Sequence, residues 1–290
     1  MSKPGRLGVG IISAGKVGAV IGAALRAAEH QIVGVHAVSE ASRERAENLL
    51  PEVPVLEIDD ILRRAELIVF AVPDDQLGPL VQGLADGGHF KPGHLVLHTA
   101  GRFGLEVLEP ARAAGAIGLA IHPAMTFTGL SLDLGRLADC VFGVTAEAMM
   151  LPIAQALVVE MGAEPVVIKD ADRPLYHAAL AHASNHLVTL TGQSAQLLGR
   201  LGVERPDRIL GPLMRASLEN ALAAGEDALT GPVARGDSGT VAEHAAALTE
   251  EDDGVARAYA AMARATAERA AARGRITQAQ AQEIARLLGA

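Results

Sequence analysis

A glycine-containing turn near the N-terminus has the residue types and spacing of a phosphate-binding loop. It keeps the frame G-x-G-x-x-G but has serine at the first position: Ser13-Ala14-Gly15-Lys16-Val17-Gly18. The N-terminus of a helix offers unpaired N–H groups and partial positive charge, so a pyrophosphate binds there if the backbone can approach it closely. Gly15 permits that approach, and Gly18 lets the helix lie against the preceding strand. The pattern predicts a dinucleotide site, and the alternative is a turn that serves chain packing alone.

The residues after the second apolar run indicate which dinucleotide binds. An acidic residue there accepts hydrogen bonds from a ribose 2′-hydroxyl, as in NAD sites, whereas hydroxyls and arginine receive a 2′-phosphate. Ser39, Ser42 and Arg43 favour NADP, and Glu40 is the competing signal for NAD. Either serine could also cap the helix that follows, and the two roles are compatible. We therefore predict NADP as the cofactor.

Three further residues follow predicted strands at the edge where a dinucleotide crosses a doubly wound sheet. Val72 and Pro73 come at the end of one apolar run, and Thr99 follows the next. We predict that all three contact the cofactor. For Pro73 the alternative is an ordinary strand-to-helix turn, with Asp74 or Asp75 as the N-cap.

Two histidines end predicted strands at the same edge of the sheet. His98 and His122 lie where open α/β sheets bind ligands, and imidazole can give or take a proton near neutral pH. Arg102 could hold a substrate carboxylate with two hydrogen bonds, or pair with a surface acid. We predict all three as catalytic candidates, and the alternative for each histidine is a structural role.

A long helix predicted after residue 172 carries further polar side chains. His182 and Asn185 share a face, and His182 and His186 are four residues apart. The second spacing suits a metal pair, but no nearby Glu or third ligand accompanies it, so we predict no metal. Asn185 is the better catalytic candidate, because we expect its amide to be buried and to need hydrogen-bond partners. The alternative is an interhelical hydrogen bond in the core.

The elements that position these residues alternate between apolar runs and helix-like stretches as far as residue 168. The apolar runs are 7–12, 32–38, 67–72, 94–98, 117–121, 140–144 and 165–168, and helix-like stretches include 17–29, 42–50 and 146–161. Runs without polar alternation are typical of parallel strands covered on both faces. The pattern predicts an α/β fold with a Rossmann-type, doubly wound and mostly parallel sheet, forming a dinucleotide-binding domain over residues 1–168.

After residue 168 the strand signal stops and helical segments follow. We predict one long helix beginning near residue 172, and further helices over 206–224, 240–248, 255–273 and 276–288. Thr277 and Gln280 have the spacing of a capping box. We assign residues 169–290 to an all-helical domain for substrate binding and dimerisation. Its helices carry broad apolar faces that one small domain could not bury, so we expect a homodimer.

Composition excludes several classes of function. The 290 residues include 25 basic and 34 acidic side chains, a net charge of −9, with five Phe, two Tyr and no Trp. An acidic chain with few stacking platforms predicts no nucleic-acid partner. The apolar stretch 7–25 is interrupted by Lys16 and five glycines, so we expect neither a signal peptide nor a membrane partner. The single cysteine, Cys140, fits a reducing compartment, so we expect a cytoplasmic protein in which this thiol is buried and unreactive.

Five motifs together carry a resemblance to known proteins. Besides the turn 13–18 they are His98-Thr99-Ala100-Gly101-Arg102, His122-Pro123-Ala124-Met125-Thr126-Phe127, Tyr176-His177 with Ser184-Asn185, and Thr230-Gly231-Pro232-Val233-Ala234-Arg235-Gly236-Asp237. The chain resembles the superfamily of NADP-dependent dehydrogenases that includes 6-phosphogluconate dehydrogenase, pyrroline-5-carboxylate reductase, ketopantoate reductase and prephenate dehydrogenase. It most resembles a largely uncharacterised branch that pairs a Rossmann-like domain with a C-terminal helical domain of unassigned function.

The resemblance implies hydride transfer between NADPH and a small carboxylate-bearing oxo acid, as in ketopantoate reductases. Those enzymes carry a helix with Lys, then Asn four and eight residues later. With Asn185 as the last member, His177 stands at the lysine and Ala181 at the middle asparagine. His177 is therefore a further catalytic candidate, able to donate a proton at lower pH or beside a charge partner.

The resemblance also leaves alternatives open. A cyclic-imine reductase and a prephenate-type dehydrogenase are alternatives within the same class of enzyme. Because the lysine is missing, a non-catalytic NADP-binding sensor or assembly protein is an alternative of another class.

Overall fold

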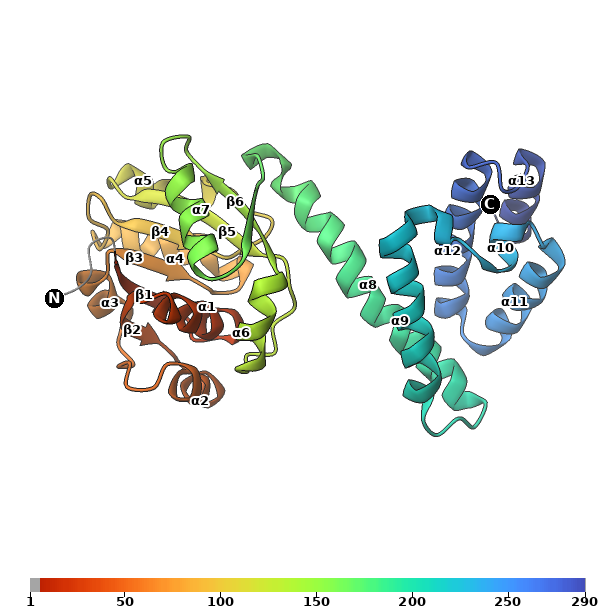
Figure 1. The fold of residues 1–290 in the computed structure, drawn as a ribbon, viewed down its shortest axis with the longest axis horizontal. Coiled ribbons are helices and arrows are strands. Elements are labelled where there is room, and N and C mark those ends of the chain that lie inside the picture. Colours follow the sequence, from red (N-terminus) through yellow and green to blue (C-terminus); the bar gives the residue numbers. More distant parts are fainter. Residues whose placement is uncertain (1–5, 290) are drawn as a thin grey trace. The chain divides into compact units, whose positions relative to one another are not determined.

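The computed structural model describes residues 6–289 and divides the chain into two compact units, Met1–Ala183 and Ser184–Ala290. The division falls inside the long helix α8 (Arg173–Arg200), which begins in the first unit and ends in the second (Figure 1). The last strand ends at Val167, close to residue 168, where the strand signal of the sequence stops.

The first unit contains a seven-stranded sheet with the strand order β2-β1-β3-β4-β5-β6-β7. Its strands are β1 (Gly8–Ile12), β2 (Gln31–His36), β3 (Leu67–Phe70), β4 (Leu95–His98), β5 (Ile117–Pro123), β6 (Val141–Ala146) and β7 (Glu164–Val167). Strands β1 to β5 are mutually parallel, which confirms the mostly parallel sheet predicted from the sequence.

Two strands, β6 and β7, run opposite to the other five. β6 runs antiparallel to β5, and β7 is parallel to β6. The segment between β5 and β6 contains only the short helix α6 (Leu132–Arg136) and a 3₁₀ turn. Antiparallel neighbours need no crossover helix, whereas parallel ones do. The prediction of a mostly parallel sheet did not say which strands depart from it, because a buried apolar run looks the same in both orientations.

Helices cover both faces of this sheet and form two separate cores. Alternate strand residues point to opposite faces, so Val69 packs in one core and Phe70 in the other. The first core includes α1 (Lys16–Ala27), α2 (Glu40–Leu49) and α7 (Leu151–Glu160). The second includes α3 (Ile58–Arg64), α4 (Asp74–Asp86) and α5 (Glu109–Ala113). The chain passes to one side of β1 for β2 and to the other for β3, so the sheet has its switch point between β1 and β3.

The second unit is helical. After the end of α8 it contains α9 (Pro206–Ala224), α10 (Gly231–Arg235), α11 (Ser238–Glu251), α12 (Asp253–Ala272) and α13 (Gln278–Leu287). The predicted capping box of Thr277 and Gln280 is present at the start of α13. Its core is formed by residues of α10 to α13 with their connecting loops, while the only buried residue of α9 is Leu210.

Candidate active site

The predicted phosphate-binding turn joins β1 to α1 at the switch point of the sheet. Gly15 is the N-cap of α1, and the N–H of Ala14 donates to the carbonyl of His36 at 2.8 Å. A Cβ atom at Gly18 would lie 2.1 Å from the carbonyl oxygen of Ser13, so only glycine lets the helix approach the strand this closely. Ser13 has a φ of 79°, in the left-handed region that favours glycine. The turn thus keeps its expected geometry, and the serine bears the backbone strain.

A pocket of about 560 Å³ opens at the carboxyl ends of β1, β2 and β3. Six of the residues predicted to bind the cofactor line this pocket: Ser13, Gly15, Lys16, Ser39, Ser42 and Val72. Other predicted residues do not line it: Ala14, Val17, Gly18, Arg43, Pro73 and Thr99. The structure adds His36, Arg45 and Gln76, for which the motif gave no signal.

The two arginines of α2 differ in where they lie. Arg45 lines this pocket and donates to the carbonyl of Ala14 at 3.2 Å. The exposed Arg43 lines a different cavity, and its Nε donates to the carbonyl of Ala37 at 3.4 Å. The hydroxyl of Ser39 accepts from the N–H of Ser42 at 3.1 Å, so Ser39 caps α2 while lining the pocket. Of these two arginines, Arg45 lines this pocket and Arg43 does not.

A second group of polar side chains lies where β5 meets the start of α8. Nδ1 of His122 is 3.0 Å from the hydroxyl oxygen of Tyr176, and the rings of His122 and His177 meet edge to face at 5.9 Å. Gly101, just after β4, makes room for them. A Cβ atom at Gly101 would lie 2.5 Å from Cδ2 of His177 and 2.9 Å from Nε2 of His122. The structure thus brings together two of the predicted catalytic residues and adds a tyrosine.

The residue beside this group is a buried arginine. Arg173, the first residue of α8, is fully buried. Its Nε donates to Oγ1 of Thr145 at 2.8 Å, and one Nη donates to the carbonyls of Ala120 (2.6 Å) and Gly143 (3.0 Å). The other Nη is buried and has no hydrogen-bond partner in the described part of the chain. Burial lowers the pKa of Arg173 to about 10, so the guanidinium is charged at neutral pH.

This environment determines the charge of His122. Burial, together with the positive charge of Arg173, lowers the pKa of His122 to about 4. His177 and His98 contribute to the same lowering of the pKa. His122 is therefore a neutral imidazole at neutral pH, which hydrogen-bonds but carries no extra proton to donate.

His98 has a structural environment. It is fully buried at the end of β4, with Nε2 2.8 Å from the carbonyl of Gly104 and Nδ1 accepting from the N–H of Ala100 at 3.2 Å. Burial lowers its pKa to about 4. Both ring nitrogens hold the loop that carries Gly101, so the structure favours the structural alternative for His98.

Two other candidates lie outside this group. Arg102 is exposed and stacks on Phe103, and its Nε lies 3.1 Å from the carboxylate of Asp74. This pairing with a surface acid is the alternative predicted for Arg102. Asn185 lies on the part of α8 that belongs to the second unit, and its side chain is exposed. The expectation that this amide is buried is wrong, because that stretch of α8 is not covered by the rest of the chain.

Cys140 is buried, as expected, and burial raises its pKa to about 11. In residues 6–289, no three or more His, Cys, Asp or Glu side chains are grouped to hold a metal ion. Over the same residues, no helix has the length and apolar character needed to cross a membrane.

Two family models match the sequence. One describes a Rossmann-like domain and matches residues 1–123. The other describes a domain of unknown function, DUF2520, and matches residues 140–266. The chain pairs a Rossmann-like domain with a DUF2520 domain. This confirms the branch predicted from the motifs, in which the C-terminal helical domain has no assigned function. No curated protein matches the sequence.

Several solved structures share the fold over nearly the whole chain. A protein from Bacteroides fragilis, provisionally assigned as an NADP oxidoreductase, is 21% identical with a TM-score of 0.76, covering 91% of this chain and 98% of its own. An imine reductase from Myxococcus stipitatus in complex with NADP+ is 17% identical with a TM-score of 0.65, covering 96% and 99%. Pyrroline carboxylate reductase from Plasmodium falciparum with NADP bound is 12% identical with a TM-score of 0.58, covering 92% and 98%. At these identities the likeness establishes the fold.

Proposed function

We propose that this protein is an NADP-dependent oxidoreductase that reduces a polar double bond in a small molecule. The observation that carries the proposal is the pocket at the switch point of the sheet. Residues of the glycine turn and of the start of α1, together with Ser39 and Ser42, all line one cavity. This is where doubly wound sheets bind dinucleotides. The names of the imine and pyrroline carboxylate reductases, both with NADP bound, support the same cofactor.

The residues present fit such a cofactor. Gly15 lines the pocket without a side chain, so the backbone N–H groups at the start of α1 are accessible to a pyrophosphate. Lys16 and Arg45 supply positive charge in the same pocket. Ser39 supplies a hydroxyl hydrogen for a 2′-phosphate, whereas the hydroxyl of Ser42 already donates to the carbonyl of Ser39 at 2.7 Å. When bound, the reduced nicotinamide supplies the hydride.

For the substrate, our first choice is a small oxo acid, and a cyclic imine is the alternative. The names of the similar structures support reduction of a C=N bond. Binding of a carboxylate by Arg102 would require it to leave Asp74. A panel of 2-oxo acids and cyclic imines, with NADPH oxidation followed by absorbance, separates these choices. Tight NADPH binding without turnover on any member would favour a non-catalytic sensor.

Calorimetry with NADPH and NADH tests the cofactor. The variant Arg45→Ala removes the guanidinium that lines the pocket, and we expect about 10- to 100-fold weaker NADPH binding with little change for NADH. Arg43→Ala is the matched control on the same helix, and it tests the assignment made from the sequence. Equal losses for both nucleotides would contradict a 2′-phosphate site, and binding of neither nucleotide to the wild-type protein would end the proposal.

We also propose that the protein is a homodimer formed through the second unit. Large apolar side chains of α8 and α9 are exposed in the single chain: Leu187, Val188, Leu190, Ile209, Leu213, Leu218 and Leu222. Exposed apolar surface on this scale marks an interaction site. The expected partner is a second copy of this chain, and sedimentation measures the mass of the assembly.

A further inference from the structure

The polar group at the end of β5 includes the phenol of Tyr176, which was not among the catalytic candidates predicted from the sequence. The rings of Tyr176 and His122 meet edge to face, with centroids 5.6 Å apart and an interplanar angle of 88°. Strand pairing places Gly143 directly opposite His122. A Cβ atom at Gly143 would lie 2.7 Å from the hydroxyl oxygen of Tyr176. Glycines at 101 and 143 therefore both leave space for this ring cluster, one on each side of His122.

The buried guanidinium of Arg173 places a positive charge beside the phenol of Tyr176. The guanidinium carbon of Arg173 lies 5.8 Å from the centre of the Tyr176 ring. Within residues 6–289, the hydrogen bonds of Arg173 all go to neutral oxygens, so no hydrogen-bonded carboxylate in this range neutralises its charge. A buried cation disfavours a second positive charge nearby and favours a negative one. It therefore opposes an imidazolium at His122 and supports a phenolate at Tyr176.

We propose that Tyr176, rather than His122 or His177, gives the proton to the substrate atom that receives one during reduction. His122 then orients the phenol, and Arg173 is a positioning residue that stabilises the phenolate. The inference rests on the oxidoreductase function proposed above. The Nδ1–H tautomer of neutral His122 donates to the phenol oxygen and leaves the phenolic hydrogen free to face the substrate.

The step balances in atoms and charge. The O–H bond of Tyr176 breaks as an O–H or N–H bond forms on the substrate, and the neighbouring carbon takes up the hydride that the proposed reduced cofactor supplies. The phenolate of Tyr176 then regains its proton from water.

The titratable groups around the phenol come from four elements. His122 lies on β5, Arg173 and His177 lie on α8, Cys140 precedes β6, and Asp170 in the turn before α8 acts on Arg173. Burial raises the pKa of Tyr176, and Arg173 opposes that rise. A phenol donor predicts turnover that falls only at alkaline pH, whereas an imidazolium donor predicts a fall as pH rises past about 6.5.

The first experiment needs neither cofactor nor substrate. The chain has two tyrosines and no tryptophan, so Tyr259→Phe leaves Tyr176 as the only phenol, and its ionisation is followed by ultraviolet absorbance. Adding Arg173→Gln to this variant should raise the pKa of Tyr176 by about one to two units, because the nearby charge is lost. Circular dichroism checks that the variant is folded. An unchanged pKa would overturn the role of Arg173.

Tyr259 supplies the matched control for the same titration. Its hydroxyl oxygen is 3.2 Å from Nδ1 of His244, so the second unit contains another tyrosine–histidine contact. With Tyr176→Phe, the remaining phenol of Tyr259 should titrate identically with and without Arg173→Gln. A shift there would mean that the substitution disturbs the protein as a whole.

The second experiment measures the reaction. Tyr176→Phe should keep NADPH affinity by calorimetry while turnover falls about 100-fold or more, and Tyr259→Phe should leave both unchanged. If Tyr176→Phe keeps more than about a tenth of wild-type turnover, the proton donor is another group. That result would leave the proposed cofactor function intact, whereas failure of the wild-type protein to bind NADPH would not.

Discussion

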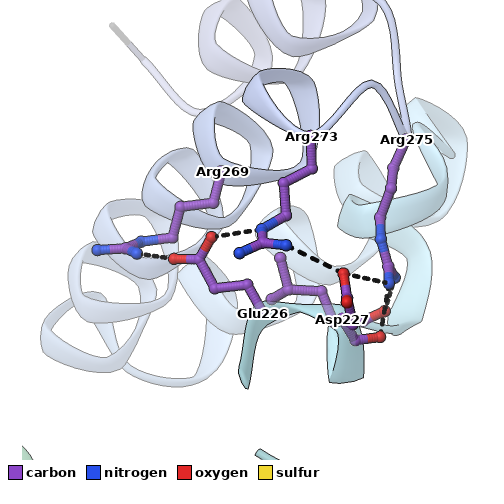
Figure 2. A network of polar contacts seen from close by, with 6 residues as sticks. Glu226, Asp227, Arg269, Arg273 and Arg275 are labelled. Atoms are coloured by element: carbon purple, nitrogen blue, oxygen red, sulfur yellow. Dashed lines mark hydrogen bonds and ion pairs between the residues drawn. The ribbon is translucent and has the colours of Figure 1, made fainter. Parts of the chain in front are cut away.

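The two units of the chain place their polar groups in opposite ways. In the described residues, all buried polar side chains belong to the first unit: His30, Ser42, His94, His98, Asp133, Thr145 and Arg173. The second unit buries apolar side chains and keeps its charges at the surface. Figure 2 shows five of them, Glu226 and Asp227 with Arg269, Arg273 and Arg275, whose side chains are 33% to 70% exposed.

This difference indicates which unit contains the chemical site and which unit mediates association. A buried polar group costs stability unless it is hydrogen-bonded, and such groups occur both in structural networks and at functional sites. Surface ion pairs contribute little stability, while large exposed apolar side chains on α8 and α9 remain uncovered in the single chain. We therefore assign chemistry to the first unit and association to the second, and the predictions below test that division.

The largest expected effect comes from glycine packing in the first unit. Gly18→Val should destabilise this unit by about 4 kcal/mol and abolish NADPH binding, because its Cβ would lie 2.1 Å from a backbone oxygen. Gly192→Ala on α8 in the second unit is the control, since a Cβ there meets nothing within 4 Å. It should stabilise by about 0.5–1 kcal/mol. Thermal unfolding and calorimetry measure both, and equal effects would contradict the packing argument.

The second effect is acid sensitivity of the first unit. The unfolded chain protonates histidine near pH 6.5, whereas folded His98 and His122 do so only near pH 4. Stability is therefore present above pH 6.5 and is lost as pH falls towards 4, by about 3 kcal/mol for each histidine. In the second unit, carboxyls such as Glu226 and Asp252 have pKa values below their usual range. The second unit therefore begins to lose stability only at the lower pH at which these carboxylates take up protons.

Urea unfolding at several pH values checks this difference. Tyr176 lies in the first unit and Tyr259 in the second, so fluorescence of the remaining tyrosine in each single Tyr→Phe variant follows one unit. His122→Gln should remove about half of the loss between pH 6.5 and 4 in the first unit. Parallel losses in both units would show that the buried histidines do not control acid stability.

Those parts of the fold that depend on local sequence signals could be predicted from the sequence. Apolar runs located all seven strands, and the capping box of Thr277 and Gln280 was read correctly, because these signals are local. The sequence did not predict that β6 and β7 are the strands that run opposite to the others, since strand direction depends on the connection rather than on the apolar run. No bounds were predicted for helices α3 to α5, although a helix start at Asp74 or Asp75 was an alternative for the turn at Pro73. The apolar patterns of α3 and α5 are short and therefore weak compared with the strands beside them.

In the candidate site, too, the sequence signals were local and did not reveal contacts between residues far apart in the chain. The glycine turn was found because its function depends on consecutive residues, and His122 because it ends a strand. Tyr176 lies 54 residues from His122 in the chain, and Arg173 lies 53 residues from Ala120. No spacing rule connects such pairs. The sequence could not show that Arg45 lines this pocket and Arg43 a different cavity, because which face of a helix turns to a pocket depends on packing.

The third effect concerns association of the second unit. Leu218 and Leu222 are one helical turn apart on α9 and are 50% and 79% exposed. Leu218→Glu with Leu222→Glu should weaken the dimer about 100-fold, because both charges would have to be buried. Met149→Glu in the first unit, where Met149 is 90% exposed, is the control and should leave association unchanged. Sedimentation should give a wild-type mass near twice 29.9 kDa, and a 29.9 kDa species would contradict the dimer.

The smallest effect is expected from the surface network of the second unit. Arg273 and Arg269 lower the pKa of Glu226, with Arg273 Nε 2.8 Å from its carboxylate (Figure 2). Glu226→Gln should lower the melting temperature slightly in low salt and not at all near 1 M salt, where exposed charges are screened. Glu219→Gln on α9 provides the comparison. A large loss that persists in salt would mean that this unit, like the first, depends on its polar contacts, and the division between the units would then fail.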